Sequence, residues 1–368
     1  MTTNTVHHHP GPIPSSAAAR SYAGKSVLVT GGNGFIGANL TAVLLAAGAR
    51  VTVADLDCTP SRASALSCQG LLDHPKLRMV ELDVLDANAL RAEMVRTRHD
   101  VIVHLAACSV IERSAMQPHE AIRTNAMGVV TLLSTLLEDD VPVPDSIVTI
   151  STDKVYGESG NEPTDEGAPL GGLGVYEAGK AAGDILARAF HATRGLPVTV
   201  LRPCNVYGPH DYGGSRLIPR ALSALYAHDE PLPPQLYADS VQHSRDFLYI
   251  EDVIEMVLAA GTSSAAIGEV FNLAGKFNAA PAEILDLLVQ CAAEWETGFD
   301  RTRAQRIRDN GVVVEPSSPP PGTLVISTQR IDGRKLSRTL GVVPVVSIEE
   351  GLRRTIAVYR DHYREGRG

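Results

Sequence analysis

Short apolar, β-branched runs alternate with longer segments of helical periodicity through the first half of the chain. Residues 26–30 form a continuous apolar run typical of a buried strand, and residues 35–47 have the apolar spacing of a helix that ends at Gly48. Further strands are predicted at 50–54, 77–82, 101–105, 147–150 and 197–201. Helices are predicted between them, near 86–97, 116–138 and 175–194. This alternation indicates βαβ units, so the pattern predicts an α/β fold with a doubly wound parallel sheet.

The pattern changes after Arg202, where proline and glycine become frequent between residues 203 and 234. A helix at 253–260, a strand at 270–273, a helix at 281–294 and a terminal helix after Ser347 are predicted beyond it. We therefore expect a sheet domain of residues 24–203, to which 241–274 return. Residues 204–240 and 275–368 are expected to form a smaller C-terminal substrate-binding lobe. Residues 1–23, with three consecutive histidines and several prolines, are predicted to be a disordered tail.

Composition narrows the class of protein. The 368 residues are 44% hydrophobic and 20% charged, which excludes a disordered or fibrous chain. A net charge of −9 argues against nucleic-acid and anionic membrane partners. No apolar run approaches the roughly 18 residues that span a bilayer. The five cysteines form no C-x-x-C pair, so we expect neither a disulfide scaffold nor a metal site, and we expect a cytoplasmic location.

A glycine motif follows the first strand directly. In T-G-G-N-G-F-I-G, residues 30–37, the glycines Gly31, Gly34 and Gly37 have the spacing of a dinucleotide-binding turn. Such glycines allow a tight turn, close approach of the backbone to a pyrophosphate, and close packing of helix on strand. The motif lies between a predicted strand and a predicted helix, so it predicts a Rossmann domain. The alternative is a glycine-rich turn that binds no ligand.

Acidic residues end the next two strands. Asp55 lies about 20 residues beyond the motif, where an acid binds the ribose hydroxyls of a dinucleotide. An acid there repels a 2′-phosphate and favours NAD, although Arg62 leaves NADP open. Asp83 either contacts the adenine or only forms a turn or caps a helix.

Tyr176 and Lys180 lie four residues apart at the start of a predicted helix, so their side chains share one face. A free phenol is a poor base at neutral pH, with a pKa of about 10. A nearby ammonium group, helped by the positive ring of NAD⁺, would stabilise the phenolate and lower this pKa. Such a pair can remove the proton from a sugar hydroxyl while hydride leaves for NAD⁺. The alternative is a chance Y-x-x-x-K spacing with a structural role.

Several motifs together resemble the extended short-chain dehydrogenase/reductase family of nucleotide-sugar epimerases and dehydratases. They are T-G-G-N-G-F-I-G (30–37), H-L-A-A (104–107), T-N-A-M-G (124–128), S-T-D-K-V-Y-G (151–157), Y-E-A-G-K (176–180), R-P-C-N-V-Y-G-P (202–209), R-D-F-L-Y-I-E-D-V (245–253) and L-G-V-V-P (340–344). The resemblance covers about residues 24–360. It is specific for the family and much less specific for one member.

The resemblance implies roles for individual residues. Thr152 would hydrogen-bond the sugar C4 oxygen and pass its proton toward Tyr176, and Lys180 would also hold the nicotinamide ribose. The substrate would be held by Asn205, Arg216 and Arg245, the first and last at its diphosphate. Besides the glycines, the acids and Lys180, the cofactor would contact Phe35, Ile36, Val84, Leu105, Ala106, Ala107 and Asn125. The alternatives are purely structural roles: a strand-end hydroxyl for Thr152, a turn-forming residue for Asn205 and a surface ion pair for Arg245.

The two residues after Thr152 bear on the reaction. Dehydratases of this family usually carry Asp at the first position, as Asp153 does here, and it serves as the acid. Lys154 departs from the Glu common at the second position, where a base removes the C5 proton. A desolvated lysine could act as that base, or it could pair with Asp153 and neutralise it.

The resemblance therefore favours an NDP-hexose 4,6-dehydratase. The alternative is a 4-epimerase, followed by a uronate decarboxylase and by a non-catalytic NAD-binding relative. The partner is expected to be a nucleotide sugar. The helices at 116–138 and 175–194 are expected either to pair with a second copy, giving a homodimer, or to be buried within the monomer.

Overall fold

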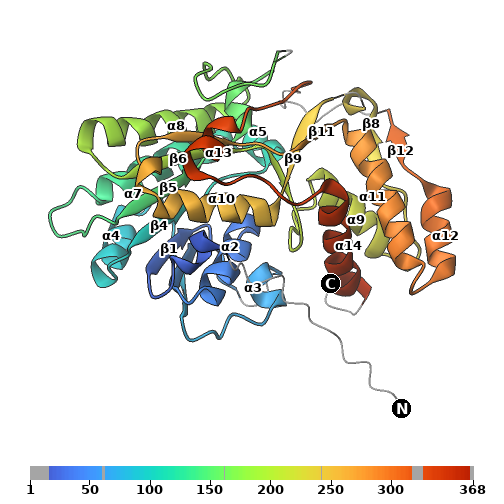
Figure 1. The fold of residues 1–368 in the computed structure, drawn as a ribbon, viewed down its shortest axis with the longest axis horizontal. Helices are drawn as coiled ribbons and strands as arrows, with labels where there is room; N and C mark the ends of the chain where they lie inside the picture. The colour runs from blue at the N-terminus through green and yellow to red at the C-terminus, as the bar shows by residue number, and fades with distance from the viewer. Residues whose placement is uncertain (1–15, 60–62, 161, 242, 317–325, 365–368) are drawn as a thin grey trace.

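The computed structural model describes residues 16–59, 63–160, 162–241, 243–316 and 326–364. Figure 1 shows two lobes, a large one with a central sheet between helices and a smaller, mainly helical one beside it. The predicted tail residues 1–15, with the three histidines, lie outside the described residues.

Seven parallel strands form the central sheet, in the order β10-β6-β5-β4-β1-β2-β3. The strands are β1 (Ser26–Thr30), β2 (Arg50–Asp55), β3 (Leu77–Glu81), β4 (Val101–His104), β5 (Ser146–Ile150), β6 (Val198–Pro203) and β10 (Val270–Leu273). The direction of winding reverses between β1 and β4, and ligands of such folds bind at the carboxyl ends of the strands there. The predicted α/β class and all seven predicted strands are confirmed.

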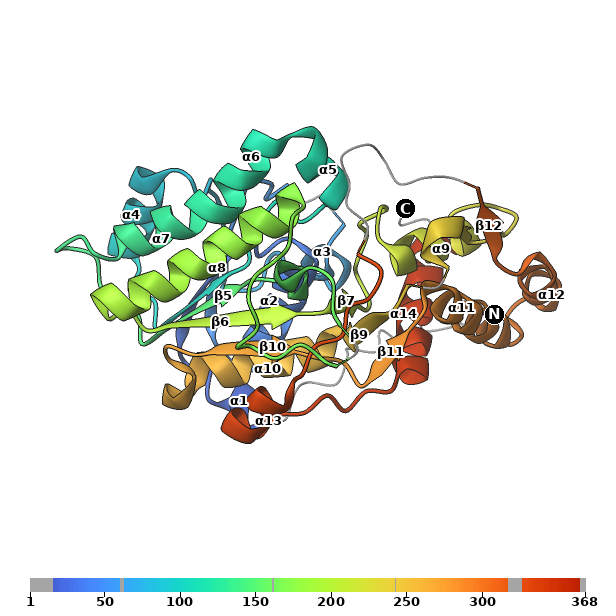
Figure 2. The same ribbon diagram turned by 90° about the horizontal axis from the view of Figure 1, so that it is seen from above.

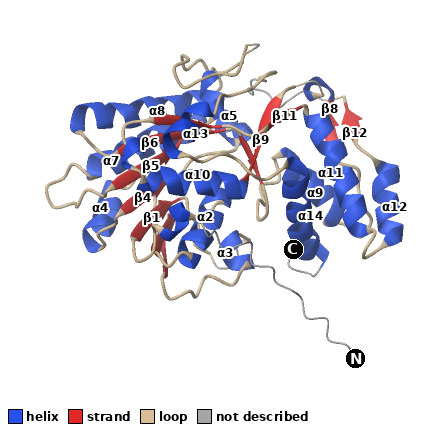
Figure 3. Cartoon of the chain, viewed as in Figure 1, coloured by secondary structure: helices blue, strands red, loops and turns tan. Residues whose placement is uncertain are grey.

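Both faces of the sheet are covered by helices, as Figures 2 and 3 show. One face packs against α2 (Phe35–Ala46) and α10 (Ile250–Thr262), and the other against α4 (Ala87–Arg96), α7 (Gly128–Thr135) and α8 (Val175–Arg194). Val27 and Val29 belong to the core of the first face and Leu28 to that of the second, because successive side chains of a strand point to opposite faces. This two-sided burial explains why the strands are continuous apolar runs.

The helix predicted at 116–138 is largely confirmed, because the chain is helical without a break from Pro118 to Thr135, but it is not one regular α-helix. The segment contains α5 (Ile111–Met116), α6 (Pro118–Ile122), a π-helical turn (Arg123–Met127) and α7. Pro118 has no N–H to continue α5, so a new helix begins there. Turns of the π type are often found at functional sites.

The smaller lobe is discontinuous in sequence. It contains β7 (Asn205–Tyr207), β9 (Arg245–Tyr249) and β11 (Phe277–Ala279) in one sheet, and β8 (Gln235–Tyr237) with β12 (Val313–Glu315) in another. Its helices are α9 (Leu217–Tyr226), α11 (Pro281–Glu296), α12 (Arg301–Asn310) and α14 (Ile348–Arg364). β9 pairs in the small sheet, whereas α13 (Arg334–Leu340) packs against β10 of the large one. The chain therefore crosses between the lobes more often than the sequence suggests. Short elements elsewhere are α3 (Ala65–Cys68) and the 3₁₀ turns Asp153–Tyr156, Ala238–Ser240 and Ser264–Ala266.

The predicted disordered tail is too long. Residues 16–23 are ordered, with α1 (Ala17–Arg20) capped by the Ser16 side chain. The fully buried Tyr22 donates a hydrogen bond to the Leu258 carbonyl of α10 at 3.2 Å. A Cβ at Gly261 would lie 2.2 Å from the Tyr22 hydroxyl, so this glycine makes room for the tyrosine. The low-complexity composition of the N-terminal segment gave no indication that Tyr22 is buried against α10. In the described part of the chain, no helix has both the length and the apolar character to cross a membrane.

Candidate active site

The glycine motif forms a close-fitting turn at the carboxyl end of β1. Gly31 has φ +68°, and a Cβ on it would lie 2.7 Å from the Ala106 nitrogen. A Cβ on Gly37 would lie 2.4 Å from the Gly31 carbonyl oxygen. No side chain caps the first turn of α2 after Gly34, so its backbone N–H groups and the positive helix end remain for an anion. These features fit the pyrophosphate of NAD.

Asp55 ends β2 and accepts a hydrogen bond from the Asn33 backbone N–H at 2.9 Å. The carboxylate therefore lies beside the glycine turn, where the sequence predicted it. Asp83 is exposed and accepts the Leu85 N–H at 2.9 Å, which is the turn-forming role left open above. Val84 is buried and packs against Gly128 of α7.

The segment after β4 lines the same edge of the sheet. Leu105, Ala106 and Ala107 are half-buried there. Asn125, in the π-helical turn, accepts the Cys108 N–H at 2.8 Å and donates to the Cys108 carbonyl at 3.1 Å. Both ends of this amide are therefore used to hold the loop that follows β4.

The first turn of α2 faces the smaller lobe. Phe35 and Ile36 are half-buried at this turn. The Arg216 guanidinium lies 5.9 Å from the centre of the Phe35 ring and pairs with the buried Asp211, the Arg216 Nε at 2.7 Å from its carboxylate. Arg216 also acts electrostatically on Tyr176. Arg216, which was predicted to bind the substrate, thus lies near both the glycine turn and Tyr176.

Tyr176 and Lys180 project from the first turns of α8, which begins at Val175. Lys180 Nζ donates to the Ile150 carbonyl at the end of β5. Burial lowers the pKa of Lys180 to about 8, an effect that Asp184 opposes. Burial and the Lys180 charge lower the pKa of His104 to about 3, so this histidine is neutral; its Nδ1 lies 2.8 Å from the Thr30 hydroxyl.

The pKa of Tyr176 differs from the one predicted from the sequence. Burial raises its pKa above 10, and the hydrogen bond with Thr152 opposes this shift only in part. In the protein alone, desolvation of the charged form therefore outweighs the predicted lowering by Lys180.

Thr152, Asp153 and Lys154 lie together at the turn after β5. The Thr152 hydroxyl donates to Asp153 Oδ1 at 3.2 Å, and Lys154 Nζ lies 3.6 Å from the same oxygen. Asp153 is 2% exposed, and its Oδ2 has no hydrogen-bond partner among the described residues. A chain of hydroxyl and carboxyl groups therefore runs from Tyr176 through Thr152 to Asp153.

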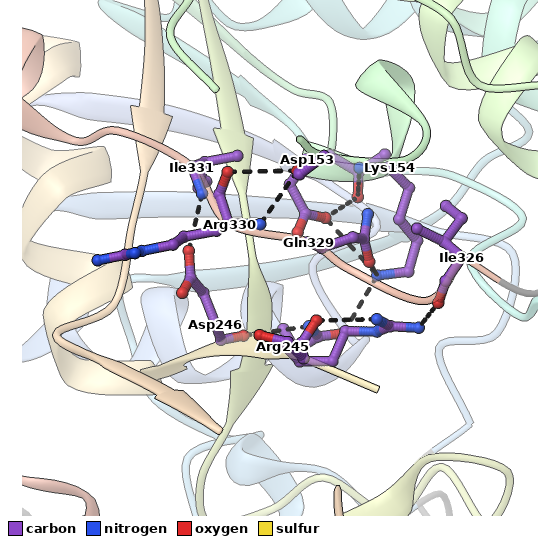
Figure 4. A network of polar contacts seen from close by, with 12 residues as sticks. Asp153, Lys154, Arg245, Asp246, Ile326, Gln329, Arg330 and Ile331 are labelled. Atoms are coloured by element: carbon purple, nitrogen blue, oxygen red, sulfur yellow. Dashed lines mark hydrogen bonds and ion pairs between the residues drawn. The ribbon is translucent and has the colours of Figure 1, made fainter. Parts of the chain in front are cut away.

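Lys154 is held by two amides from distant parts of the chain (Figure 4). Its Nζ donates to Asn205 Oδ1 at 3.1 Å and to Gln329 Oε1 at 3.4 Å. Asn205 also donates to the Asp246 carbonyl at 3.1 Å, so this predicted diphosphate ligand orients the lysine as well.

Arg245 lies at the start of β9, on the edge of the same network (Figure 4). Its guanidinium donates to the Ser244 and Ser327 carbonyls, each at 2.9 Å, and to the Ile326 carbonyl. Burial lowers its pKa, which Asp153 and Glu158 oppose. A diphosphate would therefore meet an arginine that already uses three of its five N–H donors.

Two buried polar residues of the site were not found from the sequence. Gln329 is 2% exposed and reaches Lys154 from a segment that is 175 residues away in the chain. Glu177 is 3% exposed; a Cβ on Gly172 or Gly174 would lie less than 3 Å from its side chain, and burial raises its pKa. Glu177 had a usable signal, a charged residue beside Tyr176 after two glycines, whereas only the tertiary fold brings Gln329 to the site.

Sequence comparison gives relatives over nearly the whole chain. The model of the NAD dependent epimerase/dehydratase family matches residues 27–274. A dTDP-glucose 4,6-dehydratase of Streptomyces griseus is 32% identical over 348 residues, covering 91% of this chain and 94% of that protein. The protein of the same name from Neisseria meningitidis is 32% identical over 351 residues, covering 92% and 94%.

Solved structures of dehydratases and epimerases are also similar to this chain over nearly its whole length. The dTDP-glucose 4,6-dehydratase of Streptomyces venezuelae with bound NAD has a TM-score of 0.77 at 30% identity and covers 93% of this chain and 98% of its own. The UDP-glucuronic acid 4-epimerase of Bacillus cereus with bound NAD has a TM-score of 0.76 at 26% identity and covers 92% and 100%. The glycine turn and Asp55 fit this cofactor in the present chain. The chain belongs to the NAD-dependent epimerase/dehydratase family of enzymes, and its cofactor is NAD.

Proposed function

We propose that the protein is an NDP-hexose 4,6-dehydratase. The observation that carries this proposal is the pair of buried Asp153 and half-buried Lys154 directly beside Thr152 and Tyr176. An epimerase has to oxidise and reduce C4 only, whereas elimination of water also needs an acid for the C6 hydroxyl and a base for the C5 proton. The relatives named dTDP-glucose 4,6-dehydratase support the same reaction.

The first half of the reaction uses Tyr176, Thr152 and Lys180. Thr152 holds the C4 hydroxyl and passes its proton to Tyr176, and Lys180 supplies positive charge four residues along the same helix face. NAD, when bound, supplies the hydride acceptor for C4 and a hydride for the final reduction. The resulting ketone makes the neighbouring C5–H bond acidic.

Asp153 and Lys154 carry the elimination. One proton moved across the 3.6 Å between them turns the ion pair into a carboxylic acid and a free amine. The amine takes the C5 proton, a double bond forms between C5 and C6, and the C6–O bond breaks. Asp153 gives its proton to the departing hydroxyl, which leaves as water. Asn205 and Gln329 keep the amine in place.

A 4-epimerase is the second candidate, supported by the similarity to the B. cereus UDP-glucuronic acid 4-epimerase. Incubation with CDP-, dTDP-, UDP- and GDP-glucose, followed by chromatography and mass spectrometry, separates the two. Loss of one water from one sugar supports the dehydratase. An unchanged mass with a new chromatographic peak contradicts it and supports the epimerase.

Two substitutions test the proposed roles of Tyr176 and Asp153. Tyr176→Phe should abolish turnover but leave NAD bound, and Asp153→Asn should slow dehydration by about 10²-fold or more. Asp286→Asn, at an exposed position of α11, is the matched control and should behave like the wild type. Full dehydration by Asp153→Asn would contradict its role as the acid.

We further propose domain limits, an assembly and a location. The cofactor domain is residues 24–203 with 241–274, and the substrate lobe is 204–240 with 275–368. Apolar side chains along α5, α6, the π-helical turn and α8 are exposed and support a homodimer through this face: Met116, Ile122, Met127 and Ile185. All five cysteines are unpaired, which supports the reducing cytoplasm.

A further inference from the structure

The segment of residues 326–331, which we call the crossing segment, is fastened to the catalytic end of the sheet. Glu158 accepts the backbone N–H groups of Ser327 and Thr328 at 2.8 and 2.6 Å. Ser159 N–H donates to the Thr328 carbonyl, and Gln329 N–H donates to the Ser244 carbonyl, at 2.9 and 2.8 Å. The crossing segment therefore has a fixed position between the turn after β5 and the start of β9, as Figure 4 shows.

Gln329 points from the crossing segment toward Lys154. Its Oε1 accepts a hydrogen bond from Lys154 Nζ, whereas its Nε2 is buried without a hydrogen-bond partner among the described residues. Asp153 Oδ2 is also buried without a partner among these residues, and it belongs to the carboxylate whose Oδ1 lies 3.6 Å from the same ammonium. A buried polar atom without a partner destabilises the folded protein. Two such atoms around one ammonium indicate a site shaped for a ligand group.

The two unpaired atoms select the chemistry of that group. Gln329 Nε2 can only donate a hydrogen bond, and an ionised Asp153 Oδ2 can only accept one. A hydroxyl group satisfies both, because it has one donor and two acceptor lone pairs. A carboxylate in the same place has no proton to give and would be repelled by Asp153.

We propose that Gln329 is the residue that positions the C6 hydroxyl of the sugar, and that it makes the site specific for hexoses over 6-deoxyhexoses and uronates. The assignment of the hydroxyl to C6 rests on the proposed function, which places Asp153 and Lys154 at C6 and C5. Gln329 keeps its own protons during the elimination. It holds the departing oxygen by a hydrogen bond while Asp153 protonates it.

Binding tests this proposal without requiring turnover. The NAD-loaded protein is titrated with whichever of CDP-, dTDP-, UDP- or GDP-glucose binds most tightly, and then with its 6-deoxy counterpart. The wild type should bind the 6-hydroxy sugar about tenfold more tightly, the value of one well-placed hydrogen bond. In Gln329→Leu this ratio should fall to about twofold or less. Gln305→Leu, at an exposed position of α12, is the matched control and should keep the full ratio.

Gln329→Glu separates hydroxyl binding from support of Lys154. The glutamate keeps an oxygen facing the lysine but has no N–H to donate, so the preference for the 6-hydroxy sugar should still be lost. A purely structural role predicts the opposite, namely that Gln329→Glu keeps the wild-type ratio. That result would overturn the proposal.

The outcomes also separate this proposal from the proposed function. Equal affinities of the wild type for both sugars would overturn the role of Gln329, even if the wild type eliminates water. A tenfold preference that depends on Gln329, in an enzyme that only epimerises, would support the hydroxyl site and contradict the dehydratase. Failure of all four nucleotide glucoses to bind would overturn both.

Discussion

At the scale of single residues, the site depends on groups whose charge is set by burial. His104 contacts Thr30 at the end of β1 and is 3% exposed, and its neutral form is favoured by desolvation and by the Lys180 ammonium. Lys180 is affected in the same sense, with a pKa of about 8. Lys180 therefore carries the positive charge at this edge of the sheet at neutral pH, whereas His104 is neutral.

This burial makes stability depend on pH. The pKa of His104 falls from 6.5 in the unfolded chain to about 3 in the folded protein, so the unfolded chain binds the proton first. Folding stability is therefore lost as the pH falls from 6.5 toward 3, by up to about 1.4 kcal/mol per pH unit for this one proton. Urea unfolding of His104→Asn at pH 4 to 7 should show a smaller slope with pH than the wild type.

The exposed His119 provides the control for this experiment. His119→Asn should reproduce the wild-type slope, because its side chain is exposed in the folded protein. Comparing slopes avoids the separate cost of losing the contact with Thr30. Identical slopes for all three proteins would show that His104 does not titrate as described.

At the scale of elements, α8 is held against the π-helical turn by small residues. A Cβ on Gly183 would lie 2.4 Å from the Asn125 carbonyl oxygen, and one on Gly179 would lie 3.3 Å from the Asn125 Cβ. Asn125 in turn holds the loop that follows β4 through Cys108. The spacing of α8 from this turn therefore affects both Tyr176 and the cofactor edge.

Gly183→Ala should push α8 away from the turn, because the atom it meets is backbone and cannot rotate aside. We expect destabilisation of about 1–3 kcal/mol, measured by urea unfolding, together with weaker NAD binding. Gly160→Ala has open space for its Cβ, and its φ lies outside the left-handed range, so it should change stability by less than about 0.5 kcal/mol. Equal stability of the two variants would contradict the close packing described here.

The sequence predicted the elements of the large lobe well, because their buried strands are continuous apolar runs and α8 has clear helical spacing. It also predicted the turn with Gly31, the acid Asp55 and the Tyr176–Lys180 pair, which are local patterns. It missed the π-helical turn, because the bonds of Asn125 to Cys108 are tertiary. It missed β7, β8, β9, β11 and β12, which have three to five residues each and no recognisable period.

At the scale of the whole molecule, one face carries several exposed apolar side chains. In Figure 2, α6, α7 and α8 lie side by side at the edge of the large lobe, away from the smaller one. Ile185 is 50% exposed on α8 and Met127 is 46% exposed on the neighbouring turn.

Ile185→Arg should therefore convert a dimer to a monomer, because a charge would be buried in the apolar interface. Sedimentation velocity at several protein concentrations measures this change. Val314→Arg, at a 51% exposed position of β12 in the smaller lobe, should leave the assembly unchanged. A monomeric wild type would contradict the proposed homodimer.

The crossing segment has a consequence for the order in which the enzyme becomes complete on the ribosome. All seven strands of the large sheet have been synthesised by Leu273, together with the glycine turn and the Tyr176–Lys180 pair. Gln329 is added more than fifty residues later and must return to a surface that has already formed. A nascent chain can thus fold its cofactor-binding domain before Gln329, the residue proposed to bind the sugar hydroxyl, has been synthesised. Synthesis and docking of the crossing segment, rather than closure of the sheet, therefore complete the proposed site.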